Sequence, residues 1–214
     1  MKIHVSIIAL VLSACCQFSL AQSTQPAATL IESYLIRGEL LEGEKAVTEA
    51  LRKSPEDDAL QFQLGTVQFL RGVEHLVQSL YRHGIGSRLA RLPMFDLPVP
   101  VNPSPKQISY QALRKIIETW LVGLRQAEST LAKVRRTDVK MPLHFAMRTL
   151  DFDGDDKTVP EDAFWALGVR LNLGAASRED SQKFVIGFDS ADAAWLRGYC
   201  HLLMAMSEFL LASY

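Results

Sequence analysis

Residues 30–72 read LIESYLIRGELLEGEKAVTEALRKSPEDDALQFQLGTVQFLRG and carry the strongest structural signal in the chain. Apolar residues recur three and four positions apart, the spacing that places side chains on one face of a helix. Glycines and a residue that precedes proline interrupt this spacing, and both tend to end helices. The pattern, continued to residue 84, predicts four consecutive helices, which end at Gly38, Ser54, Gly72 and Gly84.

The first half of the chain also repeats itself. The tetrapeptide at 35–38, LIRG, is followed 34 residues later by FLRG at 69–72. A helix–turn–helix unit with a 34-residue period is typical of tetratricopeptide repeats, and residues 22–92 resemble that family. Such repeats commonly bind another protein on their concave face, so the resemblance implies a protein partner. A plain cluster of four helices with a chance period is the alternative.

An acidic segment in the second half could hold a metal ion. Residues 151–162 read DFDGDDKTVPED and resemble the calcium loop of EF-hand and dockerin-type proteins. Met147 and Leu150 have a spacing that predicts a short helix entering the loop. The alternative is an acidic surface turn that only caps a following helix. For a weak Ca²⁺ site, the resemblance implies these ligands: Asp151, Asp153, Asp155, the Lys157 carbonyl and Asp162.

The remainder of residues 109–214 predicts further helices. Ser109 is a helix cap for a long amphipathic helix, and Asp189 is a cap for a final helix that begins at Ser190. Residues 139–141 and 184–186 are β-prone and are expected to pair. We therefore predict a mainly all-α fold with at most a two-stranded ribbon.

The final helix is apolar on most of its sides. Arg197, His201 and Glu208 are spaced by four and seven residues, so they lie on one narrow stripe. Three ionisable groups would be costly in lipid, which disfavours a membrane span. We expect a buried helix with one solvated, ion-paired edge. In the same helix Cys200 lies in an apolar run and is expected to be a buried, inert thiol.

The N-terminus has the order of an export signal. Lys2 precedes an apolar run at 5–12, and small residues lead to a cleavage site after Ala21, which predicts a signal peptide at 1–21. The tetrapeptide LSAC, which ends at Cys15, resembles the lipobox of bacterial lipoproteins and implies a shorter signal at 1–14 with a lipid on Cys15. The mature protein is therefore expected to be periplasmic or secreted, or to be anchored to a membrane as a lipoprotein.

A proline-rich connector is expected at 93–108, because closely spaced prolines prevent helix formation and favour extended chain. It is either a linker packed on the helices or a segment that docks into a groove for proline-rich chain.

Composition narrows the functional classes. The 23 basic and 24 acidic residues give a net charge of −1 without a basic stripe, which argues against a nucleic-acid partner. We find no metalloprotease pair, no nucleophile elbow and no phosphate loop in the sequence. The sequence predicts an exported helical adaptor or scaffold that is not an enzyme, binds another protein through the repeats and is stabilised by calcium. The alternative is an envelope enzyme with its site in the C-terminal half.

Overall fold

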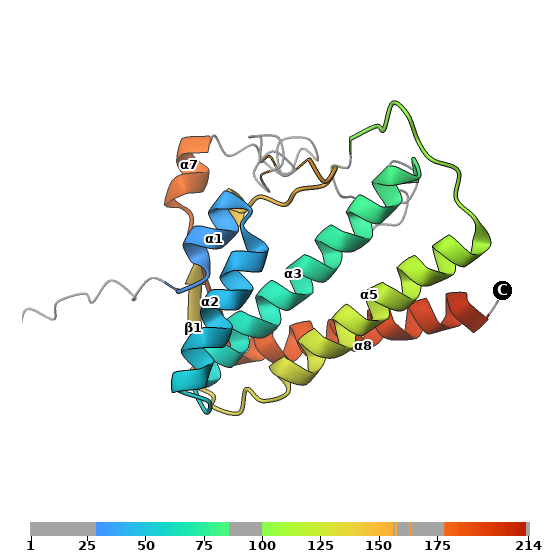
Figure 1. The fold of residues 1–214 in the computed structure, drawn as a ribbon. Coiled ribbons are helices and arrows are strands. Elements are labelled where there is room, and N and C mark those ends of the chain that lie inside the picture. The colour runs from blue at the N-terminus through green and yellow to red at the C-terminus, as the bar shows by residue number, and fades with distance from the viewer. Residues whose placement is uncertain (1–28, 86–99, 156, 158–162, 164–177, 213–214) are drawn as a thin grey trace, which may run out of the picture.

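The computed structural model describes residues 29–85, 100–155, 157, 163 and 178–212 (Figure 1). The expected signal peptide, residues 93–99 of the proline-rich connector and Asp162 lie outside these residues. The described chain is mainly helical with one two-stranded antiparallel sheet, so the predicted fold class is confirmed.

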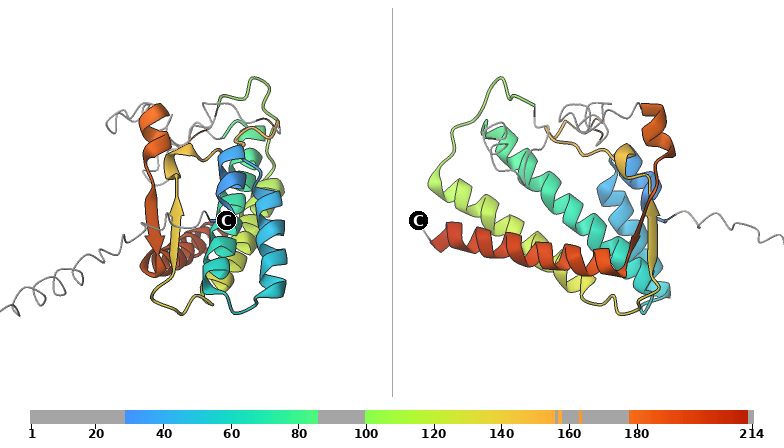
Figure 2. Two further views of the ribbon diagram at one scale, coloured as in Figure 1. Left: turned by 90° about the vertical axis from the view of Figure 1, so that its left-hand side faces the viewer. Right: turned by 180° about the vertical axis from the view of Figure 1, so that it is seen from behind.

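Three long helices form the body of the molecule, with shorter elements at one end. The helices in chain order are α1 (Glu32–Arg37), α2 (Leu40–Lys53), α3 (Asp58–Arg82), α5 (Tyr110–Leu131), the 3₁₀ helix η2 (Phe145–Met147), α7 (Arg178–Lys183) and α8 (Ser190–Ala212). Strand β1 (Lys140–Leu143) pairs with β2 (Ile186–Asp189), with Met141 opposite Phe188. Helix α5 packs against both α3 and α8, and the ribbon lies at one end of these three helices (Figures 1 and 2).

Local hydrogen bonds explain where two of the helices begin. Ser109 Oγ accepts a hydrogen bond from the amide three residues further along the chain, at 3.1 Å. Asp189 Oδ1 accepts one from the amide two residues further along, at 2.8 Å. Each cap satisfies an amide that has no partner inside its helix, and both predicted caps are confirmed.

The predicted helix end at Gly72 is wrong. Gly38 does end α1 with a left-handed φ of 71°, but α3 continues through Gly72 without a turn. A Cβ at Gly72 would lie 3.0 Å from Trp120 Cζ3, and one at Gly65 would lie 2.5 Å from Leu131 Cγ. Glycine inside a helix costs about 1 kcal/mol, and the close packing of α5 on α3 offsets it. The glycine serves the contact between helices and does not break the helix.

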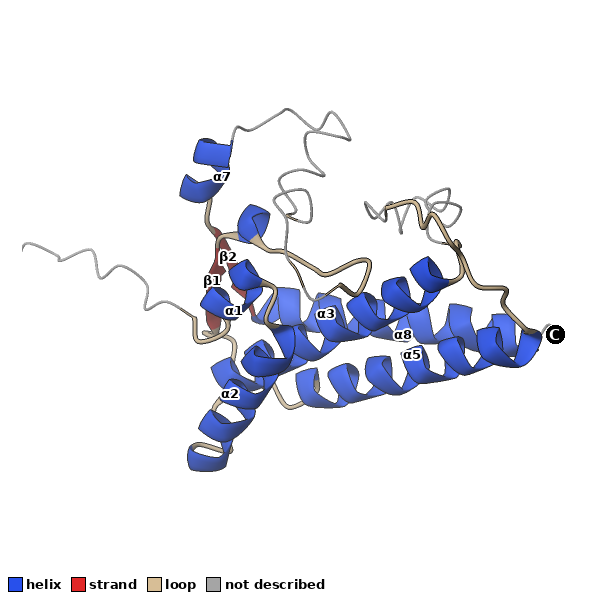
Figure 3. Ribbon diagram, turned by 45° about the horizontal axis from the view of Figure 1, so that its top comes forward, coloured by secondary structure: helices blue, strands red, loops and turns tan. Residues whose placement is uncertain are grey.

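The core has two parts that share α3. One part joins α1, α2, α3 and the ribbon around Phe62, and the other joins α5 to α8 around Leu124. Figure 3 shows how these helices and the ribbon are arranged. Cys200 is fully buried in the second part, as predicted. Burial, and then the negative charge of Glu128, raises the pKa of its thiol to about 11. The thiol is therefore protonated at neutral pH, and such a group is a poor nucleophile.

The end of the proline-rich connector packs against the C-terminal end of α3. Asn102 Nδ2 donates to the Tyr81 carbonyl at 2.9 Å, and the Lys106 amide donates to the Arg82 carbonyl at 2.9 Å. These two hydrogen bonds tie the connector to the end of α3, while most of its side chains between residues 100 and 107 are exposed, and the choice between a linker and a docking segment stays a prediction.

Candidate functional site

The acidic loop brings three predicted ligands together. One carboxylate oxygen from each of Asp151, Asp153 and Asp155 lies within 4.8 Å of the others. Gly154 turns the chain between them with a φ of 76°, a conformation that favours glycine. Carboxylate oxygens are the ligands that Ca²⁺ prefers, so the convergence fits the predicted type of site.

Contacts with α3 hold the start of the loop in place. The Asp151 amide donates to Glu74 Oε1 at 3.0 Å, and Gln78 Nε2 donates to the Asp151 carbonyl at 2.9 Å. Phe152 is 1% exposed and anchors the loop in the core. The spacing of the carboxylates is thus set partly by a rigid helix and not by the loop alone.

The electrostatics of the loop favour a cation. The pKa of Asp153 is raised, first because burial disfavours its charged form and then because Asp155 and Asp151 are negative. A raised carboxyl pKa means that the ionised loop destabilises the fold at neutral pH. A bound cation would remove this repulsion.

Three parts of the loop prediction have different outcomes. The Lys157 amide donates to Asp155 Oδ1 at 2.9 Å, and its ammonium lies 3.5 Å from Oδ2 of the same residue, so the role of its carbonyl stays a prediction. Asp162 lies outside the described residues. The entering helix is wrong, because η2 ends at Met147 and Thr149 forms a bridge with Ala163. Packing of Leu150 into the core pulls this segment into an extended conformation.

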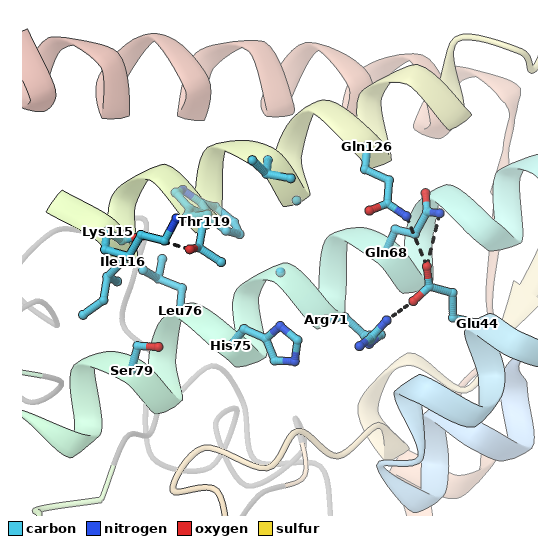
Figure 4. Close-up of a pocket in the computed structure, with 14 residues that line it drawn as sticks. Glu44, Gln68, Arg71, His75, Leu76, Ser79, Lys115, Ile116, Thr119 and Gln126 are labelled. Carbon is cyan, nitrogen blue, oxygen red and sulfur yellow. Dashed lines mark hydrogen bonds and ion pairs between the residues drawn. The ribbon is translucent and has the colours of Figure 1, made fainter. Parts of the chain in front are cut away.

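A polar groove of about 420 Å³ lies between α2, α3 and α5 (Figure 4). Glu44 accepts hydrogen bonds from Gln68 and Gln126, each at 3.3 Å, and forms an ion pair with Arg71. His75 also lines the groove, and burial followed by the charge of Arg71 lowers its pKa. Because the Glu44 carboxylate already binds three side chains, we assign the groove the structural role of joining the three helices.

A larger cavity of about 530 Å³ lies between α3, α8 and the ribbon. No local pattern in the sequence predicts this cavity, because the elements that enclose it are far apart in the chain. Its lining is mostly aromatic and aliphatic, and its rings come from Phe62, Phe69, Trp120, Phe145, Phe188, Trp195 and Tyr199. A mostly apolar cavity of this size with few polar groups is typical of a ligand site.

Among the described residues that line this cavity, Arg148 is the one with a basic side chain. Its side chain is 4% exposed, and neither Nε nor Nη2 has a hydrogen-bond partner in the described part of the chain. The guanidinium lies over the ring of Phe145 at 4.6 Å and near that of Phe188 at 5.8 Å. Burial lowers its pKa to about 10, although the charge of Glu32 opposes the change. In the sequence, Arg148 is the one charged residue in the mostly apolar stretch 141–150, and this signal could have identified it as a candidate site residue.

Helix α8 has an outer apolar face in addition to its buried one. Five large hydrophobic side chains are exposed on one side: Trp195, Leu202, Met206, Phe209 and Leu210. The expectation of a buried final helix is therefore wrong for this face. No helix in the described residues has the length and apolar character needed to cross a membrane.

The polar stripe of α8 forms the ion-paired edge that was expected. Arg197 Nε lies 2.6 Å and His201 Nε2 lies 3.2 Å from Glu128 Oε1 on α5. Glu208 pairs with Arg125 at 2.8 Å. Glu128 is mostly buried and its partners are about half exposed, as are Arg125 and Glu208, so each contact adds little stability at the edge between α8 and α5.

Comparisons of the chain with protein-family models, with curated proteins and with solved structures found no match.

Proposed function

We propose that the mature protein is an exported helical adaptor that binds another protein and carries out no reaction of its own. The observation that supports this is the outer face of α8, where five large hydrophobic side chains are exposed in one stripe. Contiguous exposed apolar surface of this kind marks interaction sites on soluble domains. Trp195 is 66% exposed and Phe209 is 72% exposed, so a partner would bury most of two aromatic rings.

The stripe is continuous along the helix. Trp195, Leu202, Met206 and Phe209 are separated by seven, four and three residues, which places them on one side of α8. A partner helix that lies along α8 would contact all four. We place the proposed surface on α8 because α3 continues through Gly72 without a turn, while the repeat resemblance of residues 22–92 and its concave binding face stay a prediction.

The alternative of an envelope enzyme needs a group that accepts a proton. Among the described residues that line the aromatic cavity, the ionisable ones are Arg148, Asp192 and Tyr199. Burial raises the pKa of Tyr199 and lowers that of Arg148 to about 10, so both keep their protons at neutral pH. Asp192 Oδ2 already accepts a hydrogen bond from the Asp189 amide at 2.8 Å. This lining favours binding over acid–base catalysis.

Site-specific photocrosslinking in the native envelope tests the adaptor proposal. A photoreactive residue at Leu202 should give one product of defined mass with a different protein. The same residue at Arg52, exposed on α2 and away from the stripe, is the control and should give none. Equal products at both positions, or none at Leu202, would contradict the proposal, and a product of twice the chain mass would indicate a self-associating protein instead.

We further propose that the acidic loop binds Ca²⁺ weakly and stabilises the adaptor. A cation that binds only the folded state raises the melting temperature as its concentration increases. Asp153→Asn combined with Asp155→Asn should abolish the increase, whereas Asp138→Asn, an exposed acid outside the loop, should preserve it. An unchanged melting temperature of the wild type in several millimolar Ca²⁺ would mean that the loop is only a turn.

Export is the remaining part of the proposal. Mass spectrometry of the mature protein should find a chain that begins at Gln22, or at a lipid-modified Cys15. An intact Met1 on a stable cytoplasmic protein would exclude both cleavage sites.

A further inference from the structure

We propose that the aromatic cavity between α3, α8 and the ribbon binds a small amphipathic carboxylate. The carboxylate would accept hydrogen bonds from Nε and Nη2 of Arg148, and the apolar tail would lie among the rings that line the cavity. This inference goes beyond the adaptor function, because Arg148 is buried and takes no part in the outer face of α8.

The free atoms of Arg148 match a carboxylate. Nε–H and one N–H of Nη2 point in the same direction, and together they fit the two oxygens of one planar carboxylate. Both of these nitrogens are buried and lack hydrogen-bond partners in the described chain. A buried donor without a partner is destabilising, so its retention in a core calls for an explanation. A ligand carboxylate that accepts hydrogen bonds from both nitrogens would supply that explanation.

The nearby acidic side chains of Glu32 and Asp192 do not pair with the Arg148 guanidinium in the described structure. Glu32 Oε1 accepts hydrogen bonds from the His144 amide and from Nδ1 of the His144 ring, both at 2.7 Å. Asp192 is held at the start of α8 by its bond with the Asp189 amide. No acidic residue in the described chain therefore forms an ion pair within 4.0 Å of the Arg148 guanidinium.

The backbone fixes Arg148 in this position. The next residue, Thr149, donates its amide to the Leu35 carbonyl at 3.1 Å and its hydroxyl to the Ile36 carbonyl at 2.9 Å. Both acceptors lie on α1, so the segment that carries Arg148 is tied to that helix. A preorganised cation loses little freedom when it binds a ligand.

The rest of the lining suits an apolar tail. Thr66 adds one buried hydroxyl that also has no partner in the described residues, and most other lining side chains are hydrocarbon or aromatic. One guanidinium balances one negative charge, so a monoanionic carboxylate fits better than a dianionic phosphate ester. A cavity of about 530 Å³ lies within the usual size of small-molecule sites. Trp195 lines the cavity and is 66% exposed, which places a route to solvent beside α8.

Calorimetric titration of the full mature protein with dodecanoate and with dodecanol tests the proposal. The two probes have the same tail length and differ in charge. We expect one dodecanoate per chain, with dodecanol at least tenfold weaker. Arg148→Met should weaken dodecanoate at least tenfold and leave dodecanol unchanged, and Arg52→Met, which removes an exposed arginine on α2, should change neither.

Two further variants separate the contribution of the Arg148 charge from that of the free volume of the cavity. Val73→Phe puts a ring into the cavity from α3 and should weaken both probes. Arg148→Lys keeps the positive charge but removes the paired N–H donors of the guanidinium. It should weaken the affinity for dodecanoate less than Arg148→Met does. Equal affinity of the wild type for both probes, binding of dodecanoate that survives Arg148→Met, or no binding of dodecanoate would each overturn the proposal. The wild-type comparison decides even if a variant fails to fold.

Discussion

Replacing two helical glycines by alanine tests how α3 and α5 pack. Gly65 lies in α3 and Gly198 lies in α8, and both are in regular helix. Alanine in a helix is about 1 kcal/mol more favourable than glycine. A Cβ at Gly198 would meet no heavy atom within 4 Å. Gly198→Ala should therefore stabilise the fold by about 1 kcal/mol, which corresponds to an increase of about 2–4 °C in melting temperature.

Gly65→Ala should have the opposite sign. The added Cβ would lie 2.5 Å from Leu131 Cγ and 2.7 Å from Cδ2, with the Ala127 carbonyl at 3.4 Å behind them. Leu131 is 2% exposed and has little room to move. Overpacking of a core costs about 1–3 kcal/mol, and a contact this short belongs at the upper end. After the gain in helix propensity, we expect a net loss of about 2 kcal/mol.

Urea denaturation followed by far-UV circular dichroism measures both effects on the free energy of unfolding. Combining Gly65→Ala with Leu131→Ala provides an internal check, because the shortened side chain makes room for the new methyl group. The penalty for Gly65→Ala should then shrink. If Gly65→Ala is as stable as Gly198→Ala, the close approach of the two helices is refuted.

Three further predictions concern single residues. Gly38→Val should destabilise the fold by about 1–3 kcal/mol in urea denaturation, because its φ of 71° strains a β-branched residue, and Gly38→Asn should lose less. Cys200, with its thiol pKa raised to about 11, should react with a disulfide reagent at about pH 8 only after unfolding. Arg148→Met should raise the melting temperature by about 2–6 °C. A guanidinium pKa lowered from its ordinary value to about 10 corresponds to about 3 kcal/mol of charge burial, of which lost ring contacts offset about 1–2 kcal/mol. Well below pH 10, Arg148 is protonated in both the folded and the unfolded state. The increase in melting temperature should therefore be the same between about pH 5 and pH 9. A lower melting temperature of Arg148→Met than of the wild type would contradict this prediction.

Local patterns predicted much of the secondary structure. The boundaries of α2 follow from its apolar spacing and from the Ser54-Pro55 stop, and the caps at Ser109 and Asp189 act through atoms two or three residues away. The antiparallel ribbon was also recognisable from two β-prone runs. The convergence of Asp151, Asp153 and Asp155 follows partly from alternation along a short loop and partly from contacts of Asp151 with α3. The two caps act between groups that are close in sequence, whereas the ribbon pairs residues 140–143 with residues 186–189.

Errors arose where a distant element determined the outcome. Gly72 has the local character of a helix end, yet Trp120 on α5 packs against it and α3 continues. Leu150 has helical spacing with Met147, yet its burial in the core favours extended chain. Burial against a remote partner can outweigh a local preference of about 1 kcal/mol per residue.

The sequence by itself determined that the protein forms amphipathic helices, where most of them begin and end, and that an acidic loop lies among them. Only the tertiary structure decided which apolar faces are covered. Helix α8 is apolar on two sides, and the sequence cannot tell that α5 covers the side of Leu203 while the side of Leu202 stays exposed. Arg148 likewise became a candidate ligand group only when α3, α8 and the ribbon enclosed it. The physical reason is that helical periodicity depends on neighbours along the chain, whereas burial depends on segments that meet through folding.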